Sequence, residues 1–312
     1  MSINEEKIII KNDINIGATI AYQDKKEKRP LVLLIGGTGS LDRNGNALGF
    51  KTNLYKDLSD MFVEMGFVCI RYDKRGTYES KINSKNFGLT ELTDDALAII
   101  KNTKKLDYVD DKKIVVCGHS EGAMIATLLT QKEDLRGIIL LGGACMSLKE
   151  ASLYQNYLVI EEVKNMKGIL GWFLRKIVKK EKIELKVEEM YKKAEECTKD
   201  TFFYSGSLIP TKYVKEHGAL SKEDYIKLLK TYKGKILAVT GKSDVQADYK
   251  QLEALKEEEN ITVMMPEELN HMLRDINTTP SIMNIKQEYK ECLKKEISPK
   301  LKMIIRNWTK TL

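Results

Sequence analysis

The stretch KKIVVCGHSEGAMIATLL, residues 112–129, decides the fold of this chain. It begins with a short apolar run, Ile114-Val115-Val116-Cys117, of the kind that forms a buried parallel strand. It then passes through Gly118-His119-Ser120-Glu121-Gly122 and continues with apolar residues at helical spacing. A strand, a tight turn with a serine at its apex and a helix together constitute a nucleophile elbow.

The two glycines of this turn have a steric reason. The turn is so sharp that Ser120 is expected in a strained backbone conformation, and side chains at Gly118 and Gly122 would collide with the neighbouring strand and helix. The helix that follows directs its N-terminal amides and partial positive charge at the serine. The elbow therefore predicts that Ser120 is a nucleophile.

Seven further apolar runs read as strands of the same sheet. The first two are expected to form an antiparallel hairpin at the sheet edge, and the others alternate with helical segments. Such alternation predicts an α/β fold: an eight-stranded, mostly parallel sheet with helices on both faces. The seven runs are residues 7–10, 16–22, 31–35, 67–72, 135–141, 235–240 and 261–265.

The alternation is interrupted between residues 146 and 232, where the pattern indicates helices and no strand. We therefore predict a core made of residues 1–145 and 233–312, with residues 146–232 as a helical cap inserted over Ser120. Trp172, Phe173 and Phe203 are candidates to line the substrate pocket. The alternative is that these aromatic residues form the cap's own core.

A serine needs a general base, and the chain has three histidines. His119 lies inside the elbow and is expected to point away from the hydroxyl of Ser120, whereas His217 lies within the insertion. His271 follows the last predicted strand, where the order Ser, Asp, His places the base. Elimination therefore favours His271.

The acid that orients the base should follow the strand that precedes it in the fold. Asp244 is the first carboxylate after the run 235–240. Asp248 is the alternative, but it falls where a helix begins and is better suited to stabilising that helix. The predicted acid is Asp244.

The tetrahedral oxyanion requires two backbone N–H donors. One is expected to be the amide of Glu121, directly after the nucleophile. The other should come from the glycine-rich loop after residues 31–35, from Gly37 or Thr38, with Thr38 favoured.

Composition is that of a globular protein, with 42% hydrophobic and 31% charged residues. The net charge of +7 could suit an anionic partner, but lysines interleaved with glutamates along helices favour solvated faces. The start MSINEEKIII has acidic residues and no long apolar core, so we do not expect it to act as a signal peptide, and no apolar run approaches the ~20 residues that span a membrane. Five scattered cysteines suit reduced thiols and predict a cytoplasmic location.

Other functional classes lack their signatures. Gly37-Thr38-Gly39 has no third glycine to complete a dinucleotide-binding motif, and Ile236 occupies the place of the first glycine of a P-loop. Three dispersed histidines give no metal-ligand spacing, so no metal and no cofactor are expected. Aromatic residues do not alternate with a basic stripe, which argues against nucleic-acid binding.

Four separated segments resemble the serine hydrolases of the α/β-hydrolase superfamily, in particular bacterial carboxylesterases of the dienelactone-hydrolase-like and serine-aminopeptidase-like groups. The resemblance implies the triad Ser120, Asp244 and His271 and a structural role for the loop of Asp73 and Arg75. Two departures are Tyr78, where the pattern has glycine, and Ser40, where it has proline. The segments are GGTGSLDRNGN at 36–46, RYDKRGTYES at 71–80, GHSEG at 118–122, and GKSDVQ with NH at 241–246 and 270–271.

Together these features predict a hydrolase that cleaves small carboxylic esters, with a small-molecule acyl ester as its partner and no cofactor. An acyl-peptide or thioester hydrolase would use the same residues, because fold analogy does not choose among these reactions. A non-catalytic binding protein on the same fold is the alternative from another class, and the complete set of catalytic residues disfavours it.

Overall fold

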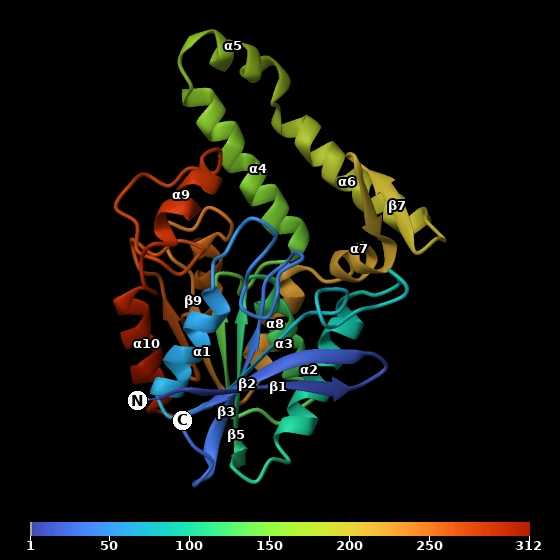
Figure 1. Cartoon of the computed structure of the whole chain (residues 1–312). Helices are drawn as coiled ribbons and strands as arrows, with labels where there is room; N and C mark the ends of the chain where they lie inside the picture. Colours follow the sequence, from blue (N-terminus) through green and yellow to red (C-terminus); the bar gives the residue numbers. More distant parts are fainter. Residues whose placement is uncertain (1) are drawn as a thin grey trace.

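A computed structural model describes residues 2–312 and shows an eight-stranded sheet between two layers of helices (Figure 1). The strand order is β1-β2-β4-β3-β5-β6-β9-β10. All eight predicted strands are present, so the predicted mostly parallel sheet is confirmed. The strands are β1 (Asn4–Lys11), β2 (Asn15–Tyr22), β3 (Arg29–Ile35), β4 (Val68–Tyr72), β5 (Val109–His119), β6 (Gly137–Leu141), β9 (Lys235–Val239) and β10 (Ile261–Met264).

The pairing of the strands brings the loops of interest to one edge of the sheet. β1 and β2 form the predicted antiparallel hairpin, β2 pairs antiparallel with β4, and the remaining neighbours are parallel. In the centre, Ile35 at the end of β3 pairs with Gly118 near the end of β5. Because parallel strands end at the same edge, the glycine-rich loop after β3 lies beside the elbow after β5.

Each face of the sheet buries its own apolar core. α2, α3 and α8 cover one face, and α1, α9 and α10 cover the other (Figure 1). Each of these helices except α3 turns an apolar stripe toward the sheet, as period-3.6 spacing requires, whereas α3 is buried on almost all sides. Their bounds are α1 (Leu54–Glu64), α2 (Leu89–Thr103), α3 (Glu121–Leu129), α8 (Lys222–Thr231), α9 (Ile285–Cys292) and α10 (Pro299–Thr309), with the 3-10 helix η1 (Tyr249–Leu255) before β10.

Residues 146–232, called the insertion below, connect β6 to β9. α4 (Leu148–Asn165) rises from the sheet edge, α5 (Gly168–Ile177) lies at the top of the molecule, and α6 (Lys180–Glu196) returns toward α7 (Thr211–Gly218) (Figure 1). α8 also falls within these residues, but it contacts α3 and buries Leu229 in the core of the sheet. The sequence analysis assigned α8 to the insertion because helical periodicity does not show which neighbour a helix packs against.

The insertion also contains a β-hairpin, so the expectation of helices alone is wrong. β7 (Thr201–Tyr204) pairs antiparallel with β8 (Ser207–Pro210). The connecting Ser205 and Gly206 have φ of 47° and 86°, as a two-residue hairpin turn of type I′ requires. The aromatic and β-branched residues TFFY, followed by Ser-Gly, are the sequence features that indicate this hairpin.

Candidate active site

The elbow has the strained geometry that the sequence predicts. Ser120 has φ 56° and ψ −122°, a region that residues with side chains rarely adopt, and its N–H donates to the Leu141 carbonyl at 2.8 Å. A Cβ at Gly118 would lie 2.1 Å from the Gly122 oxygen, and one at Gly122 would lie 2.1 Å from the Ile35 oxygen. Only glycine therefore fits on either side of Ser120, which presents its hydroxyl above the sheet edge.

Asp244 and His271 are brought together by neighbouring strands. Asp244 follows β9 and His271 follows β10, and His271 Nδ1 lies 2.8 Å from Asp244 Oδ2. The other carboxylate oxygen, Oδ1, accepts hydrogen bonds from the N–H groups of Gln246 and Ala247 at 2.7 and 2.9 Å. Both side chains are buried. These contacts fix the carboxylate and direct the remaining imidazole nitrogen, Nε2, away from it.

Asp248, the alternative acid, has a different position. Its carboxylate accepts a hydrogen bond from the Lys250 N–H at 3.0 Å and one from the Gln251 amide at 3.0 Å, so it caps the N-terminus of η1. This is the helix-start role that the sequence indicated.

Ser120 and His271 line one cavity of about 400 Å³, a volume suited to a small ligand. The start of α4 forms its outer wall. Most of the other lining side chains are apolar, and the cavity is lined in part by Leu41, Phe50, Met124, Met146, Leu148, Ala151 and Met272. Ser120 and His271 therefore line one mostly apolar recess.

The two candidates for the second oxyanion donor differ in their partners. The Gly37 N–H donates to Tyr55 Oη at 2.6 Å, so this amide is engaged. Thr38, the next residue, lines the cavity, and Glu121 lines it too. Glu121 is the first residue of α3, where backbone N–H groups have no carbonyl partner within the helix.

A buried hydrogen-bond chain that the sequence did not reveal joins this loop to the backbone of His271. Tyr55 Oη lies 3.1 Å from His119 Nδ1, and His119 Nε2 lies 2.9 Å from the carbonyl oxygen of His271. Because a carbonyl only accepts, Nε2 carries the proton and Nδ1 accepts from the Tyr55 hydroxyl. Burial, aided by His271, lowers the pKa of His119 to about 3, so the ring is neutral.

The side chain of Glu121 belongs to a second buried cluster. It contacts Lys74 Nζ, Tyr213 Oη and His217 Nε2, the last at 3.1 Å. Burial opposes ionisation, but Lys74 and His217 together hold the pKa of this carboxyl below its usual value. Tyr213 and His217 lie on α7, so the cluster connects the insertion to the residue after Ser120. The sequence placed His217 in the insertion but gave no sign of this pairing.

The loop of Asp73 and Arg75 is held by ion pairs, as the resemblance implies. Asp73 pairs with Arg43 at 2.6 Å, and Arg75 pairs with Asp95 at 2.7 Å and with Asp13 at 2.6 Å. Tyr78 has φ 38°, so this chain adopts a left-handed conformation with tyrosine where the pattern has glycine.

Trp172, Phe173 and Phe203 do not join the cavity. They are 55%, 52% and 67% exposed, and the cavity wall is formed by other residues. Trp172 and Phe173 lie on α5, beyond the far end of α4, whose 18 residues span about 27 Å. Helix length therefore separates them from Ser120, and they do not form a core of the insertion either.

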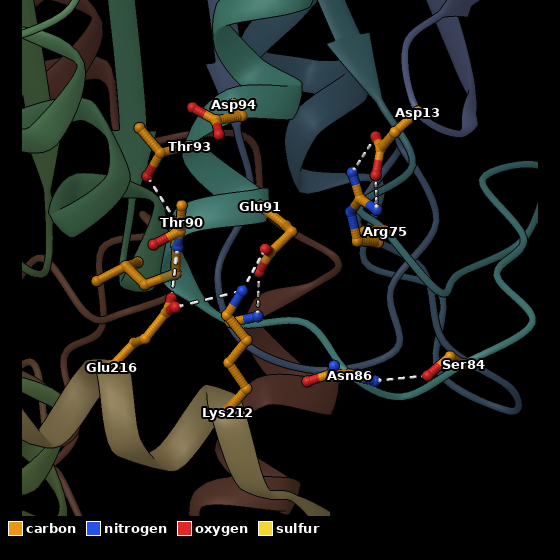
Figure 2. Close-up of polar contacts among 12 residues, drawn as sticks. Asp13, Arg75, Ser84, Asn86, Thr90, Glu91, Thr93, Asp94, Lys212 and Glu216 are labelled. Carbon is orange, nitrogen blue, oxygen red and sulfur yellow. Dashed lines mark hydrogen bonds and ion pairs between the residues drawn. The ribbon is translucent and has the colours of Figure 1, made fainter. Parts of the chain in front are cut away.

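Further contacts hold the insertion to the rest of the molecule. On α7, Lys212 pairs with Glu91, and Glu216 accepts a hydrogen bond from the Thr90 N–H at 2.7 Å, so α7 is fixed at the start of α2 (Figure 2). Gln155 on α4 donates to the Gln246 carbonyl at 3.1 Å, next to Asp244. The base of the insertion is thus anchored around the site.

Two further properties concern residues 2–312 as a whole. No group of three or more His, Cys, Asp or Glu side chains in this range is arranged to hold a metal ion. No helix in the same range is long and apolar enough to cross a bilayer.

Comparison with known proteins places the chain among hydrolases. Residues 48–265 match the family described as serine aminopeptidase, S33. The chain is 24% identical to esterase EstD of Thermotoga maritima over 249 residues, which are 78% of this chain and 54% of EstD. The chain thus spans about half the length of this curated relative.

Solved structures share the fold at low sequence identity. Est1E from Butyrivibrio proteoclasticus, solved with ferulic acid, has a TM-score of 0.57 at 18% identity and covers 93% of this chain and 99% of its own. The acylaminoacyl peptidase of Pyrococcus horikoshii has a TM-score of 0.54 at 14% identity, covering 95% of this chain and 42% of its own. With most of its length matched by the family model, the chain belongs to the S33 serine aminopeptidase-like family of α/β-hydrolases.

Proposed function

We propose that this protein is a serine hydrolase that cleaves small carboxylic esters, with Ser120 as nucleophile, His271 as general base and Asp244 as the acid that orients it. The observation that carries the proposal is the position of His271, which lies 2.8 Å from Asp244 and lines one cavity together with Ser120 at a strained strand-to-helix turn. The similarity of the chain to EstD, an esterase, supports it.

In the proposed reaction, Ser120 Oγ attacks the ester carbonyl while His271 Nε2 takes the hydroxyl proton. The tetrahedral intermediate collapses, and the imidazolium gives its proton to the departing alkoxide, which leaves as the alcohol. Water then attacks the acyl-enzyme with the same base and releases the acid. Asp244 stabilises the imidazolium and fixes its tautomer, so the cycle regenerates the starting protonation states.

The oxyanion of the intermediate would accept hydrogen bonds from the backbone amides of Glu121 and Thr38. Gly37, the third candidate, is better suited to support this loop because its own amide donates to Tyr55. Donors fixed in advance favour the charge that develops in the transition state.

The lining of the cavity favours an ester over an aminoacyl amide. A substrate with a free α-ammonium group requires a carboxylate partner in the pocket. Among the lining residues in the described part of the chain, Glu121 is the one acid, and its carboxylate already pairs with Lys74. The apolar wall suits an uncharged acyl group, although the family description, a serine aminopeptidase, makes aminoacyl amides the second candidate.

The insertion outside α8 is proposed to act as a cap on a core of residues 1–145 and 233–312, which α8 joins at one face of the sheet. The start of α4 forms the outer wall of the cavity and supports this role. Triad, oxyanion donors and cap would then operate together without a cofactor. The five cysteines are free, which fits the predicted cytoplasmic location.

A substrate panel tests the proposal. Purified protein is assayed with p-nitrophenyl esters of increasing acyl length, with acyl-CoA thioesters and with aminoacyl p-nitroanilides, each beside Ser120→Ala. We expect turnover of the short esters that is lost in Ser120→Ala. Turnover of aminoacyl amides without ester cleavage would instead identify a peptidase, and turnover retained in Ser120→Ala would refute the assigned nucleophile.

A further inference from the structure

α5 presents an apolar face to solvent. Ile169, Trp172, Phe173 and Ile177 follow the spacing i, i+3, i+4, i+8, which places them on one side of the helix. All four are exposed, Ile169 to 86%. The opposite side, with Gly171 and Leu174, is the more buried one and faces α4. A helix in a globular protein normally turns its apolar stripe inward, so this face requires a partner.

The same segment is strongly basic. Between Val163 and Glu181 the sequence contains six cations and no acid. All six are exposed: Lys164, Lys167, Arg175, Lys176, Lys179 and Lys180. This contrasts with the rest of the helical surface, where lysines alternate with glutamates, and it makes the tip of the insertion a local positive patch.

The cations surround the apolar face and a neighbouring cavity. Lys176 Nζ lies 3.6 Å from the centre of the Trp172 ring. Below α5, a cavity of about 660 Å³ between α4 and α6 is lined by four of the cations together with Glu161 and Glu181. Lys164 and Lys180 have acidic partners at 2.6 and 3.7 Å, whereas Lys167, Lys176 and Lys179 have none among residues 2–312.

We propose that α5 and its flanking lysines, residues 164–180, form a docking surface for an anionic phospholipid membrane. Aromatic and aliphatic side chains on one face with lysine and arginine around them are the features of a helix that lies in the interfacial plane of a bilayer. The apolar face enters the acyl boundary while the lysines contact anionic headgroups. Charge complementarity selects this occupant over a second copy of the chain, whose own tip would bring six like charges against six.

The position of α5 agrees with such docking. It lies at the extremity of the molecule, far from the sheet and from both termini (Figure 1). The described contacts that anchor the insertion involve α4 and α7, so α5 can meet a flat surface without disturbing them. The inference concerns binding alone and does not depend on the reaction proposed for Ser120.

Tryptophan fluorescence provides a direct test, because the chain has two tryptophans, exposed Trp172 and buried Trp308. The full chain is titrated with vesicles of phosphatidylcholine alone and with vesicles containing equal amounts of phosphatidylcholine and phosphatidylglycerol. We expect a blue shift and co-sedimentation with the anionic vesicles that weaken as salt is added, and neither with neutral vesicles. Trp172→Phe should remove the shift while co-sedimentation persists.

Two double variants separate the apolar and electrostatic contributions. Ile169→Ser with Phe173→Ser should weaken binding at least about tenfold, because two large apolar side chains no longer enter the acyl boundary. Lys176→Glu with Lys179→Glu should also weaken binding at least about tenfold, because each cation near an anionic surface contributes about fivefold. The matched control is Met303→Ser with Lys310→Glu, exposed positions at α10 that should bind like the wild type. Unchanged thermal unfolding temperatures check that all three variants fold.

Other results would overturn the proposal. Equal binding to neutral and anionic vesicles, or no binding to either, contradicts an anionic docking surface. A lipid-free dimer that is lost in Ile169→Ser with Phe173→Ser, without vesicle binding, would show that a second copy covers this face.

Discussion

His119 makes the acid stability of this protein predictable. Its imidazole is buried and neutral, donates to the His271 carbonyl and accepts from Tyr55. Burial lowers its pKa from 6.5 to about 3, so between pH 7 and pH 5 the unfolded chain takes up a proton here that the folded chain does not. Since the unfolded state then binds more protons, the free energy of unfolding falls as the pH falls.

The size of this effect follows from the two pKa values. Lowering the pH from 7 to 5 should reduce the free energy of unfolding by about 2 kcal/mol through His119 alone. The reason is that pH 5 lies about 1.5 units below the pKa of this histidine in the unfolded chain and well above its pKa in the folded chain. In His119→Gln the side-chain amide can still donate to the His271 carbonyl, but it does not titrate. We therefore expect the loss of unfolding free energy between pH 7 and pH 5 to be about 2 kcal/mol smaller in the variant.

Urea unfolding at both pH values measures the difference. Tyr55→Phe is the control, because it removes the hydroxyl and leaves the buried imidazole, and it should keep the pH dependence of the wild type. Identical pH dependence in the wild type and His119→Gln would refute a neutral buried His119.

Three further predictions concern the site. Asp244→Asn should lower kcat for ester hydrolysis about 10⁴-fold, because it favours the wrong tautomer of His271. Asp248→Asn should be close to wild type, because asparagine caps a helix as well as aspartate does; the reverse pattern of kcat values would show that Asp248 is the acid. Glu121→Gln should lower the free energy of unfolding, measured by urea denaturation, by about 3 kcal/mol, because it leaves the buried Lys74 ammonium unpaired. Adding Lys74→Met should recover most of that loss, and no recovery would mean that the Glu121–Lys74 pair is not what stabilises this region. Gly142→Ala should reduce kcat about 10²-fold, because Gly142 has a φ of +59° and a Cβ there would lie 3.1 Å from both the Asp244 carboxylate and His271 Nδ1. Unchanged steady-state kinetics would contradict the tight packing around the Asp244–His271 pair.

The eight-strand sheet and the places of Ser120, Asp244 and His271 could be predicted because the signals are local. Each predicted strand is a mostly apolar run, and each of these residues lies in the turn or loop that follows such a run at the same sheet edge. The steric need for glycine at positions 118 and 122 likewise depends on the turn alone.

The polar network around the site depends on contacts distant in sequence. Tyr55 and His119 are 64 residues apart, and Glu121 and His217 are 96 apart, so no periodicity reveals that they meet. The same holds for Trp172 and Phe173. An aromatic pair on an amphipathic helix predicts burial, but here a long α4 carries the pair away from any surface of the sheet.

Covalent labelling tests the central claim most directly. The protein is treated with a fluorophosphonate probe, digested, and its peptides are mapped by mass spectrometry beside those of Ser120→Ala and His271→Ala. We predict an adduct on the peptide that contains Ser120, absent in Ser120→Ala and strongly slowed in His271→Ala, because both nucleophile and base are needed. Failure to label the wild type, or equal labelling of Ser120→Ala, would contradict the assignment of Ser120 as the nucleophile.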